Sequence, residues 1–400
     1  MKIKPDYKPN GGRYEIINLI HHTGIISRES LSLLKNIVTL KDVIIKLKKE
    51  DILQKTVSKT RDNTYYIRGY YSIADYNKCK KEGYFDYISD EAKEYYKNFA
   101  VKDLYKMRVS KKSIQDRIQN NADTVVIMKA AGIEIDISKK EHYFRRGYRG
   151  EPMYLQSREL KSLVSYRGDN VKEKIVHGEL VKDILATRIT GLMISEGVGY
   201  CVYNSLVSEN LSGENESLIL NFINNWIQKK HKDTLKEIKE AIIISRKEDK
   251  LKGLVNPKAI NKNKVLNFIK VFTGGVYVLP YNVQGRQLLE IMKAKDWKER
   301  IRYYRYETTE PYSNGSIRCD SYDKKTNTYG LLFCIPDIKR LRSFIRYAKN
   351  EYENMYEDRA NYEIYCFDFQ EKLIKDLVGD LMTVYVISIE ELSKGIGIDI

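Results

Sequence analysis

From about residue 176 onward, short apolar runs alternate with segments of helical spacing, and this alternation constrains the fold more than any other feature. Segments such as ENESLILNFINNWIQKKH have the period of an amphipathic helix. Short strands that alternate with helices predict an α/β sheet with both faces covered. In such sheets, functional residues gather at strand ends. The apolar runs of strand length are RITGLMIS, GYCVYNSLV, KEAIIIS, GGVYVLPYN, YGLLFCIPD, YEIYCFDFQ and MTVYVISIEEL.

The first 81 residues carry a localised positive charge. They contain 17 Lys and Arg against 8 Asp and Glu, which is more than half of the net charge of +16. A positive field confined to one part of a chain indicates a polyanionic partner, with nucleic acid first and a membrane surface second.

Residues 14–69 have the pattern of a winged helix. Residues 14–21 have helical spacing, a second helix is expected to begin near Ser27, and Thr39 can cap a third helix through TLKDVIIKLKKEDIL. The segments LQKTV and TYYIRG alternate around the polar turn SKTRDN, which predicts a hairpin. A winged helix places its third helix in the major groove and its wing on the DNA backbone.

The third helix and the hairpin therefore contain the expected DNA-contacting residues. Lysine and arginine side chains there would contact phosphates, which position a protein on DNA without reading sequence. The alternative is that these lysines form a solvated face and that the winged helix binds protein. The residues are Thr39, Lys41, Lys46, Lys48, Lys49, Lys55, Lys59, Arg61 and Arg68.

The middle of the chain is polar and has the pattern of a helical connector. Helix starts are expected at Ser89 and Ser110, and a stop at Gly132. The basic and aromatic stretch EHYFRRGYRG has the composition used to bind single strands, through Arg145, Arg146 and Arg149, although a plain solvated loop fits it equally. We therefore predict a winged-helix domain over 1–75, a connector over 76–150 and an α/β domain over 151–400.

Several classes of protein are disfavoured by the sequence. No apolar run approaches the roughly 20 residues that span a bilayer, and MKIKPDYKPNGGRYE lacks the apolar core of a signal peptide. The five cysteines are scattered and form no CxxC pair, so neither a zinc knuckle nor a disulfide framework is indicated. These features predict a cytoplasmic protein without a membrane partner.

Common catalytic motifs are also missing from the sequence. It contains no GxxxxGK[ST] loop, no GxGxxG that opens a helix and no GxSxG elbow, and its five histidines form no HxH or HExxH pattern. The catalytic chemistry that remains open to this sequence is metal binding by carboxylates. From Gly178 to Ile244 the predicted order helix, strand, strand, helix, strand follows the outline of a restriction-endonuclease-like core, which holds Mg²⁺ or Mn²⁺ with carboxylates.

The D…(E/D)xK signature of that core is absent, so the candidates are chosen by their position near strand ends. Arg188 would contact phosphate or brace the sheet, and Tyr203 would be a nucleophile or a core aromatic. The alternative for each carboxylate is a surface or capping role. The candidate catalytic residues are Arg188, Tyr203, Glu216, Asp368 and Gln370, and the candidate metal ligands are Glu179, Glu216 and Asp368.

Four segments of the chain resemble a known group of proteins. The segments are TRITGLMISEGVGYCVYNSL, AIIIS, GGVYVLPYNVQGRQLLEIM and EIYCFDFQEKL with the later VYVISIEEL. They resemble proteins of Firmicutes mobile elements that couple a winged helix to an α/β domain, similar in plan to plasmid replication-relaxation proteins and MobC-type mobilisation relaxases.

The resemblance implies DNA binding at a plasmid or integrative-element origin, with strand nicking by a metal-dependent, carboxylate-based site. The implied partners are an origin or operator duplex or a single strand, with a homodimer and mobilisation or replication accessory proteins left open. The alternative is a non-catalytic replication initiator or transcriptional regulator, in which the α/β domain is an interaction platform.

Overall fold

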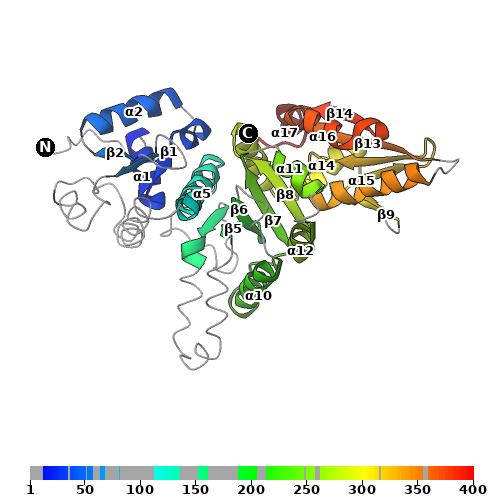
Figure 1. Ribbon diagram of the computed structural model, residues 1–400, viewed down its shortest axis with the longest axis horizontal. Helices are drawn as coiled ribbons and strands as arrows, with labels where there is room; N and C mark the ends of the chain where they lie inside the picture. The colour runs from blue at the N-terminus through cyan, green and yellow to red at the C-terminus, as the bar shows by residue number, and fades with distance from the viewer. Residues whose placement is uncertain are drawn as a thin grey trace. The chain divides into compact units, whose positions relative to one another are not determined.

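A computed structural model divides the chain into two compact units, Met1–Lys161 and Ser162–Ile400 (Figure 1). The division falls about ten residues after the expected start of the α/β domain at 151. The structure describes residues 12–34, 37–50, 52–56, 64–67, 81, 112–135, 152–160, 188–204, 213–246, 249–256, 262–314, 317–354 and 359–400.

The first unit is built from helices and a small antiparallel sheet. The sheet has the order β1-β3-β2, with Ile26 paired to Tyr65 and Leu53 paired to Ile67. The elements in chain order are α1 (Gly12–Thr23), β1 (Ile26–Ser27), the 3-10 turn η1 (Ser30–Leu33), α2 (Ile37–Lys49), β2 (Leu53–Thr56), β3 (Thr64–Ile67), α5 (Lys112–Ala130) and β4 (Met153–Gln156).

Apolar residues at helical spacing form the core of this unit. Ile16 and Ile20 of α1 are buried, as are Leu40, Ile44 and Leu47 of α2, and the two helices are in contact. The expected strands of the hairpin are present and antiparallel.

Two details of the prediction are wrong. The second helix is only the single 3-10 turn η1, and α2 begins at Ile37, so Thr39 lies inside the helix and is not its cap.

Helix α5 belongs to the first unit and is held there by a buried carboxylate. Asp123 accepts hydrogen bonds from the hydroxyls of Ser27 and Ser30 at 3.2 and 2.6 Å, and from the side-chain amide of Gln119 at 2.9 Å. A buried charge is tolerated where several donors satisfy it. The expected stop is confirmed, because α5 ends at Ala130 and Gly132 has a φ of 73°. The helix start expected at Ser89 lies outside the described residues.

The second unit begins with a mixed sheet in which β5, β6, β7 and β8 are neighbours in that order. Strands β5 (Ile189–Ser195) and β6 (Val198–Asn204) are antiparallel, and β7 (Glu240–Ser245) and β8 (Gly275–Pro280) continue the sheet in parallel. Glu196 and Gly197 both have positive φ in the tight turn between β5 and β6. Between the parallel strands lie α10 (Gly213–Lys230), α11 (Asp249–Val255) and α12 (Lys262–Val271).

A second mixed sheet follows, with the order β11-β12-β13-β14. Its first two strands are antiparallel and the others are parallel. The remaining elements of the unit are α13 (Val283–Met292), α14 (Trp297–Tyr306), β9 (Tyr312–Asn314), β10 (Ile317–Cys319), β11 (Ser321–Asp323), β12 (Thr328–Leu332), α15 (Ile338–Glu353), β13 (Asn361–Phe367), η6 (Asp368–Gln370), α16 (Glu371–Val378), η7 (Gly379–Leu381), β14 (Thr383–Ile387) and α17 (Ile389–Gly395).

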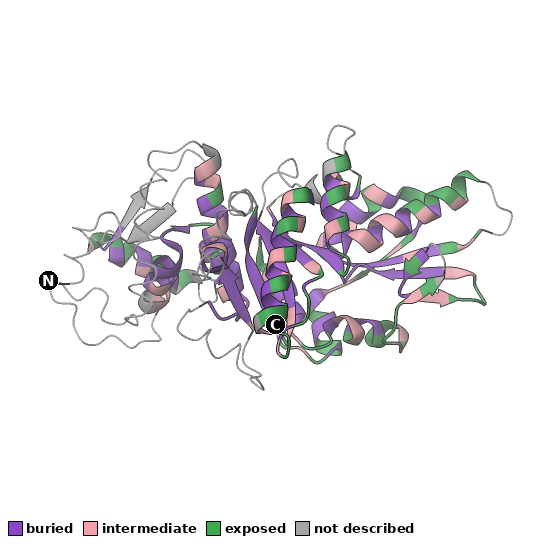
Figure 2. Ribbon diagram, turned by 90° about the horizontal axis from the view of Figure 1, so that it is seen from below, coloured by how far each residue is buried: buried purple, intermediate pink, exposed green. Residues whose placement is uncertain are grey.

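The α/β prediction is confirmed for this unit. Figure 2 shows buried strands in purple between helices whose outer sides are exposed and green. The hairpin, helix and parallel strand of the predicted outline occur as β5, β6, α10 and β7, whereas residues 178–187, which include Glu179, lie outside the described residues. None of the helices described in the structure is long and apolar enough to cross a membrane.

Candidate functional site

Helix α2 presents a lysine-rich face to solvent. Its inner side is buried, whereas Lys41, Lys46, Lys48 and Lys49 are exposed. Val38 and Ile45 are exposed on the same outer side, at 71% and 52%. Positions 38, 41, 45 and 48 follow one another at helical spacing and therefore share one face. This solvent-facing side, named the α2 face, consists of Val38, Lys41, Asp42, Ile45, Lys46, Lys48 and Lys49.

The other predicted DNA-contacting residues are only partly described. Thr39 lies on α2 and Lys55 on β2, and the structure describes the backbone alone for these two. Residues Lys59, Arg61, Arg68, Arg145, Arg146 and Arg149 lie outside the described residues. The α2 face is thus the described part of the predicted nucleic-acid interface.

Three of the predicted catalytic residues, Arg188, Tyr203 and Glu216, meet at the C-terminal end of β6, in the sheet that contains β5 to β8. Ile189 pairs with Tyr203, so Arg188 lies beside the end of β6, and Glu216 is in the first turn of the helix that follows. Glu216 accepts hydrogen bonds from the Arg188 backbone N–H at 3.2 Å and from the Tyr203 hydroxyl at 2.7 Å. The hairpin and α10 are thereby joined.

Tyr203 is fully buried, and its surroundings keep it protonated. Its ring packs edge-on against Phe268 and Phe272, with centroids 5.2 and 6.0 Å away. Burial, and after it the Glu216 carboxylate, raises the pKa of Tyr203 well above its usual value. A protonated phenol that donates to a buried carboxylate acts as a brace. Tyr203 thus has the surroundings of a core aromatic, whereas Glu216 is buried and not at the surface.

Two arginines, Arg188 and Arg246, also lie on the side of this sheet where β6 and β7 end. The Arg188 side chain is exposed. Arg246 directly follows β7, and its guanidinium lies 3.8 Å from the centroid of the Tyr281 ring. Helices α10 and α13 begin after β6 and β8, so their positive N-terminal ends point to this side of the sheet. Arginines and helix N-termini are the groups that bind phosphate oxygens.

Asp368 and Gln370 belong to a different sheet. They form the 3-10 turn η6 after β13. Asp368 is exposed and accepts a hydrogen bond from the Phe369 backbone N–H at 2.7 Å, and Gln370 is buried and accepts one from the Phe367 backbone N–H at 3.0 Å. Both side chains therefore stabilise the turn. Among the described residues, no three His, Cys, Asp or Glu side chains are grouped so that they could hold a metal ion.

Sequence reasoning missed the ionic contacts of α14, one half-buried and one buried. Lys298 of α14 pairs with Glu240 at the start of β7, which also accepts the Tyr277 hydroxyl at 3.0 Å. Arg302, one turn further along α14, donates to the buried Asp320 at 2.8 Å. The signal in the sequence is the spacing of Lys298, Arg302 and Arg305, which places three cations on one face of α14.

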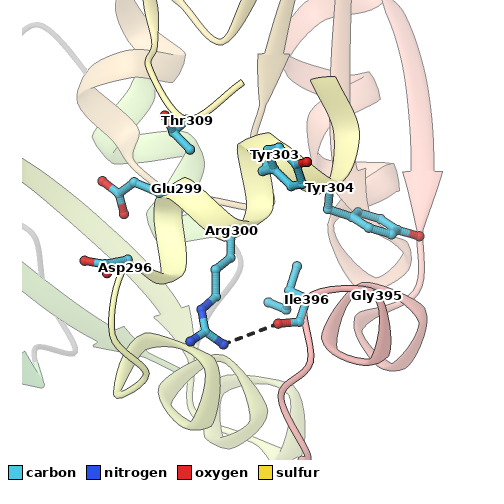
Figure 3. A pocket seen from close by; sticks show the side chains of 8 residues that line it. All are labelled: Asp296, Glu299, Arg300, Tyr303, Tyr304, Thr309, Gly395 and Ile396. Carbon is cyan, nitrogen blue, oxygen red and sulfur yellow. Dashed lines mark hydrogen bonds between the residues drawn. The ribbon is translucent and has the colours of Figure 1, made fainter. Parts of the chain in front are cut away.

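The opposite side of α14 lines an open pocket (Figure 3). Figure 3 shows Arg300 reaching toward the segment after α17, where its guanidinium donates to the Ile396 carbonyl at 3.4 Å. Tyr304 packs against Gly395 so closely that a Cβ there would lie 2.2 Å from the ring. The lining residues are Asp296, Glu299, Arg300, Tyr303, Tyr304, Thr309, Gly395 and Ile396.

No family model matches the chain, and comparisons with curated proteins and with solved structures also find no match. The resemblance to mobile-element proteins therefore stays a hypothesis that rests on the four quoted segments.

Proposed function

We propose that the chain is a duplex-DNA-binding protein whose α2 enters the major groove. One observation carries this proposal: α2 buries Leu40, Ile44 and Leu47 and turns its lysines to solvent. A helix that is packed on one side and basic on the other is suited to a groove lined by phosphates.

The arrangement of the first unit supports a winged-helix interpretation. Its order α1, β1, η1, α2, β2, β3 and its antiparallel sheet β1-β3-β2 are what a winged helix requires, with η1 in the place of the second helix. The exposed Val38 and Ile45 lie among the lysines of the α2 face, and apolar side chains there can contact thymine methyl groups. Lysines alone would position the helix without reading sequence.

For the second unit we propose a binding role, as in a replication initiator or regulator acting at an origin or operator. Both carboxylate oxygens of Glu216 already accept hydrogen bonds, and Asp368 holds a turn of the other sheet. Arg188 and Arg246, at the C-terminal ends of β6 and β7, suit contact with DNA phosphates. Nicking with Mg²⁺ or Mn²⁺ is the competing function, and relaxation of a supercoiled plasmid separates the two.

A salt titration of DNA binding tests the role of α2. In the variant Lys46→Gln/Lys48→Gln/Lys49→Gln, we expect weaker binding to every duplex sequence in fluorescence anisotropy. The plot of log affinity against log salt concentration should become shallower, with a slope smaller by about 1 for each replaced lysine that neutralises a phosphate in the wild-type complex.

The matched control removes the same charge elsewhere. Lys324, Lys325 and Lys394 are exposed lysines of the second unit, and Lys324→Gln/Lys325→Gln/Lys394→Gln should keep both the affinity and the slope. Equal losses of affinity in the two triple variants would mean that net charge, and not α2, governs binding. An unchanged affinity in the α2 variant would show that α2 does not bind in the major groove.

A further inference from the structure

The two sheets of the second unit are built on the same plan. Each begins with an antiparallel strand pair, continues with a helix, a parallel strand, helical turns and a further parallel strand, and ends with a helix. The first half is β5, β6, α10, β7, α11 with α12, β8 and α13, and the second half is β11, β12, α15, β13, α16, β14 and α17. In both halves the strands are neighbours in chain order.

The equivalence extends to single residues of the last strands. Strand β8 contains Val276-Tyr277-Val278, and β14 contains Val384-Tyr385-Val386. Tyr277 pairs with Ile242 of β7, and Tyr385 pairs with Tyr365 of β13.

A glutamate lies two residues before each of those partners. The Tyr277 hydroxyl donates to Glu240 at 3.0 Å, and the Tyr385 hydroxyl donates to Glu363 at 3.4 Å. Helix α14 supplies a cation to each half, since Lys298 pairs with Glu240 and Arg305 lies 4.3 Å from the centroid of the Tyr365 ring. Strands β8 and β14 therefore occupy equivalent positions in the two halves of the unit.

The outer edge of β8 is covered by an antiparallel segment of the same chain. The Val278 N–H donates to the Pro336 carbonyl at 3.0 Å, and the Val276 N–H donates to the Asp337 carboxylate at 3.2 Å. Tyr277 and Asp337 form an antiparallel bridge. Tyr277 and Val278 are only 1% and 7% exposed, and the Tyr277 ring also packs edge-on against Tyr200 and Trp297.

The outer edge of β14 is open in the part of the chain that the structure describes. β14 is the last strand of its sheet, and the bridges between described residues place nothing on its outer side. Tyr385 and Val386, the equivalents of the two covered residues, are 41% and 44% exposed. The strand TVYVI contains no charge, proline or glycine, so it lacks the features that keep an edge from pairing with another chain.

We propose that β14 pairs antiparallel with β14 of a second copy of this chain, so that the two second sheets form one continuous sheet. The covered edge of β8 shows that this type of edge accepts an antiparallel segment. Pairing of identical strands about a two-fold axis closes the assembly at a dimer. Centring the pair on Tyr385 places Val384 opposite Val386 of the partner subunit.

The charge distribution favours a protein partner over nucleic acid at this edge. Residues 296–400 contain 16 Lys and Arg against 19 Asp and Glu, in contrast to the basic first 81 residues. A slightly acidic segment of the chain does not favour a polyanion, and the uncharged strand has no repulsion from its own copy. The dimer edge is thus independent of the proposed DNA contact.

The oligomeric state of the full chain tests the proposal. Analytical ultracentrifugation should give a dimer for the wild type and a monomer for Tyr385→Lys/Val386→Lys, because the two lysines at 385 would lie directly opposite each other and the two at 386 would lie opposite Val384 on the other face of the joined sheet. The control Leu218→Lys/Tyr303→Lys changes two residues that are also exposed, on α10 and α14, and should stay dimeric. Thermal unfolding of each variant shows that loss of the dimer is not loss of the fold.

A cross-link tests the register without disturbing the edge. Tyr385→Cys should form a disulfide-linked dimer on mild oxidation, because opposed residues of an antiparallel pair have Cα atoms about 4.5–5.5 Å apart. Tyr303→Cys, exposed on α14, should not. A wild type that is monomeric at micromolar concentration, or a Tyr385→Lys/Val386→Lys variant that remains dimeric, overturns the proposal. Dimers without the Tyr385→Cys cross-link overturn the register.

Discussion

Gly285 shows how closely a helix can begin after a strand. It lies in the first turn of α13, and its N–H donates to the Asn282 side chain at 3.0 Å. A Cβ at this position would lie 1.7 Å from the Pro280 carbonyl oxygen. Any residue other than glycine must therefore move either the end of β8 or the start of α13.

We expect Gly285→Ala to lower the free energy of unfolding by at least about 1–3 kcal/mol, the usual cost of overpacking. Gly253→Ala is the control, because nothing lies within 4 Å of a Cβ there. In helix α11 that change should stabilise by roughly 0.5–1 kcal/mol. Urea unfolding measures both, and equal effects would contradict the close approach seen at Gly285.

At the scale of elements, the Tyr203–Glu216 hydrogen bond connects a strand to the helix that follows it. Glu216 is in the first turn of α10 and accepts a hydrogen bond from the hydroxyl of Tyr203, at the end of β6. A buried carboxylate that loses a donor keeps its full desolvation cost. Loss of this hydrogen bond should therefore destabilise the protein more than the loss of an exposed one.

Replacing Tyr203 by Phe removes only the hydroxyl. We expect Tyr203→Phe to destabilise by about 1–3 kcal/mol, since one Glu216 oxygen would be left without its donor. Tyr303→Phe, at an exposed position of α14, should stay within about 0.5 kcal/mol of the wild type. Chemical denaturation of both variants is the measurement, and a neutral Tyr203→Phe would show that Glu216 finds another donor.

At the scale of the whole molecule, charge and architecture are unevenly divided. The positive excess lies toward the N-terminus, with the α2 face, whereas the last hundred or so residues are slightly acidic and carry β14, whose outer edge no described strand covers. This division suits the proposed DNA contact in one part and the proposed strand pairing in another. Metal-dependent strand cleavage would need, in addition, carboxylates assembled around a metal.

We expect the full chain to shift supercoiled origin plasmid in a gel without relaxing it, at any protein concentration, in Mg²⁺ or Mn²⁺. The physical reason is that the Glu216 and Asp368 carboxylates are engaged at different sheets. Relaxed circles that disappear in both Glu216→Gln and Asp368→Asn would establish nicking in place of binding alone. Relaxation that persists in both variants would point to a contaminating nuclease.

The sequence by itself determined the elements and their inner faces. The buried stripe of α2, the strands β5 to β8 and β12 to β14, and the stop at Gly132 follow from spacing that is visible within ten to twenty residues, because helices and strands repeat with fixed periods. Strand β11 was not predicted. The same reasoning placed Thr39 as a cap and extended η1 into a helix, because helix ends depend on packing as well as on local residues.

Only the tertiary structure decided what each polar side chain meets. Glu216 reaches a tyrosine 13 residues away, Glu240 a lysine 58 residues away, and Asp320 an arginine 18 residues away. The pairing of Tyr277 and Tyr385 with equivalent glutamates likewise depends on strand register. Burial makes such partners obligatory, since a polar group removed from water must find one, and the chain's topology selects which residue is near enough to serve.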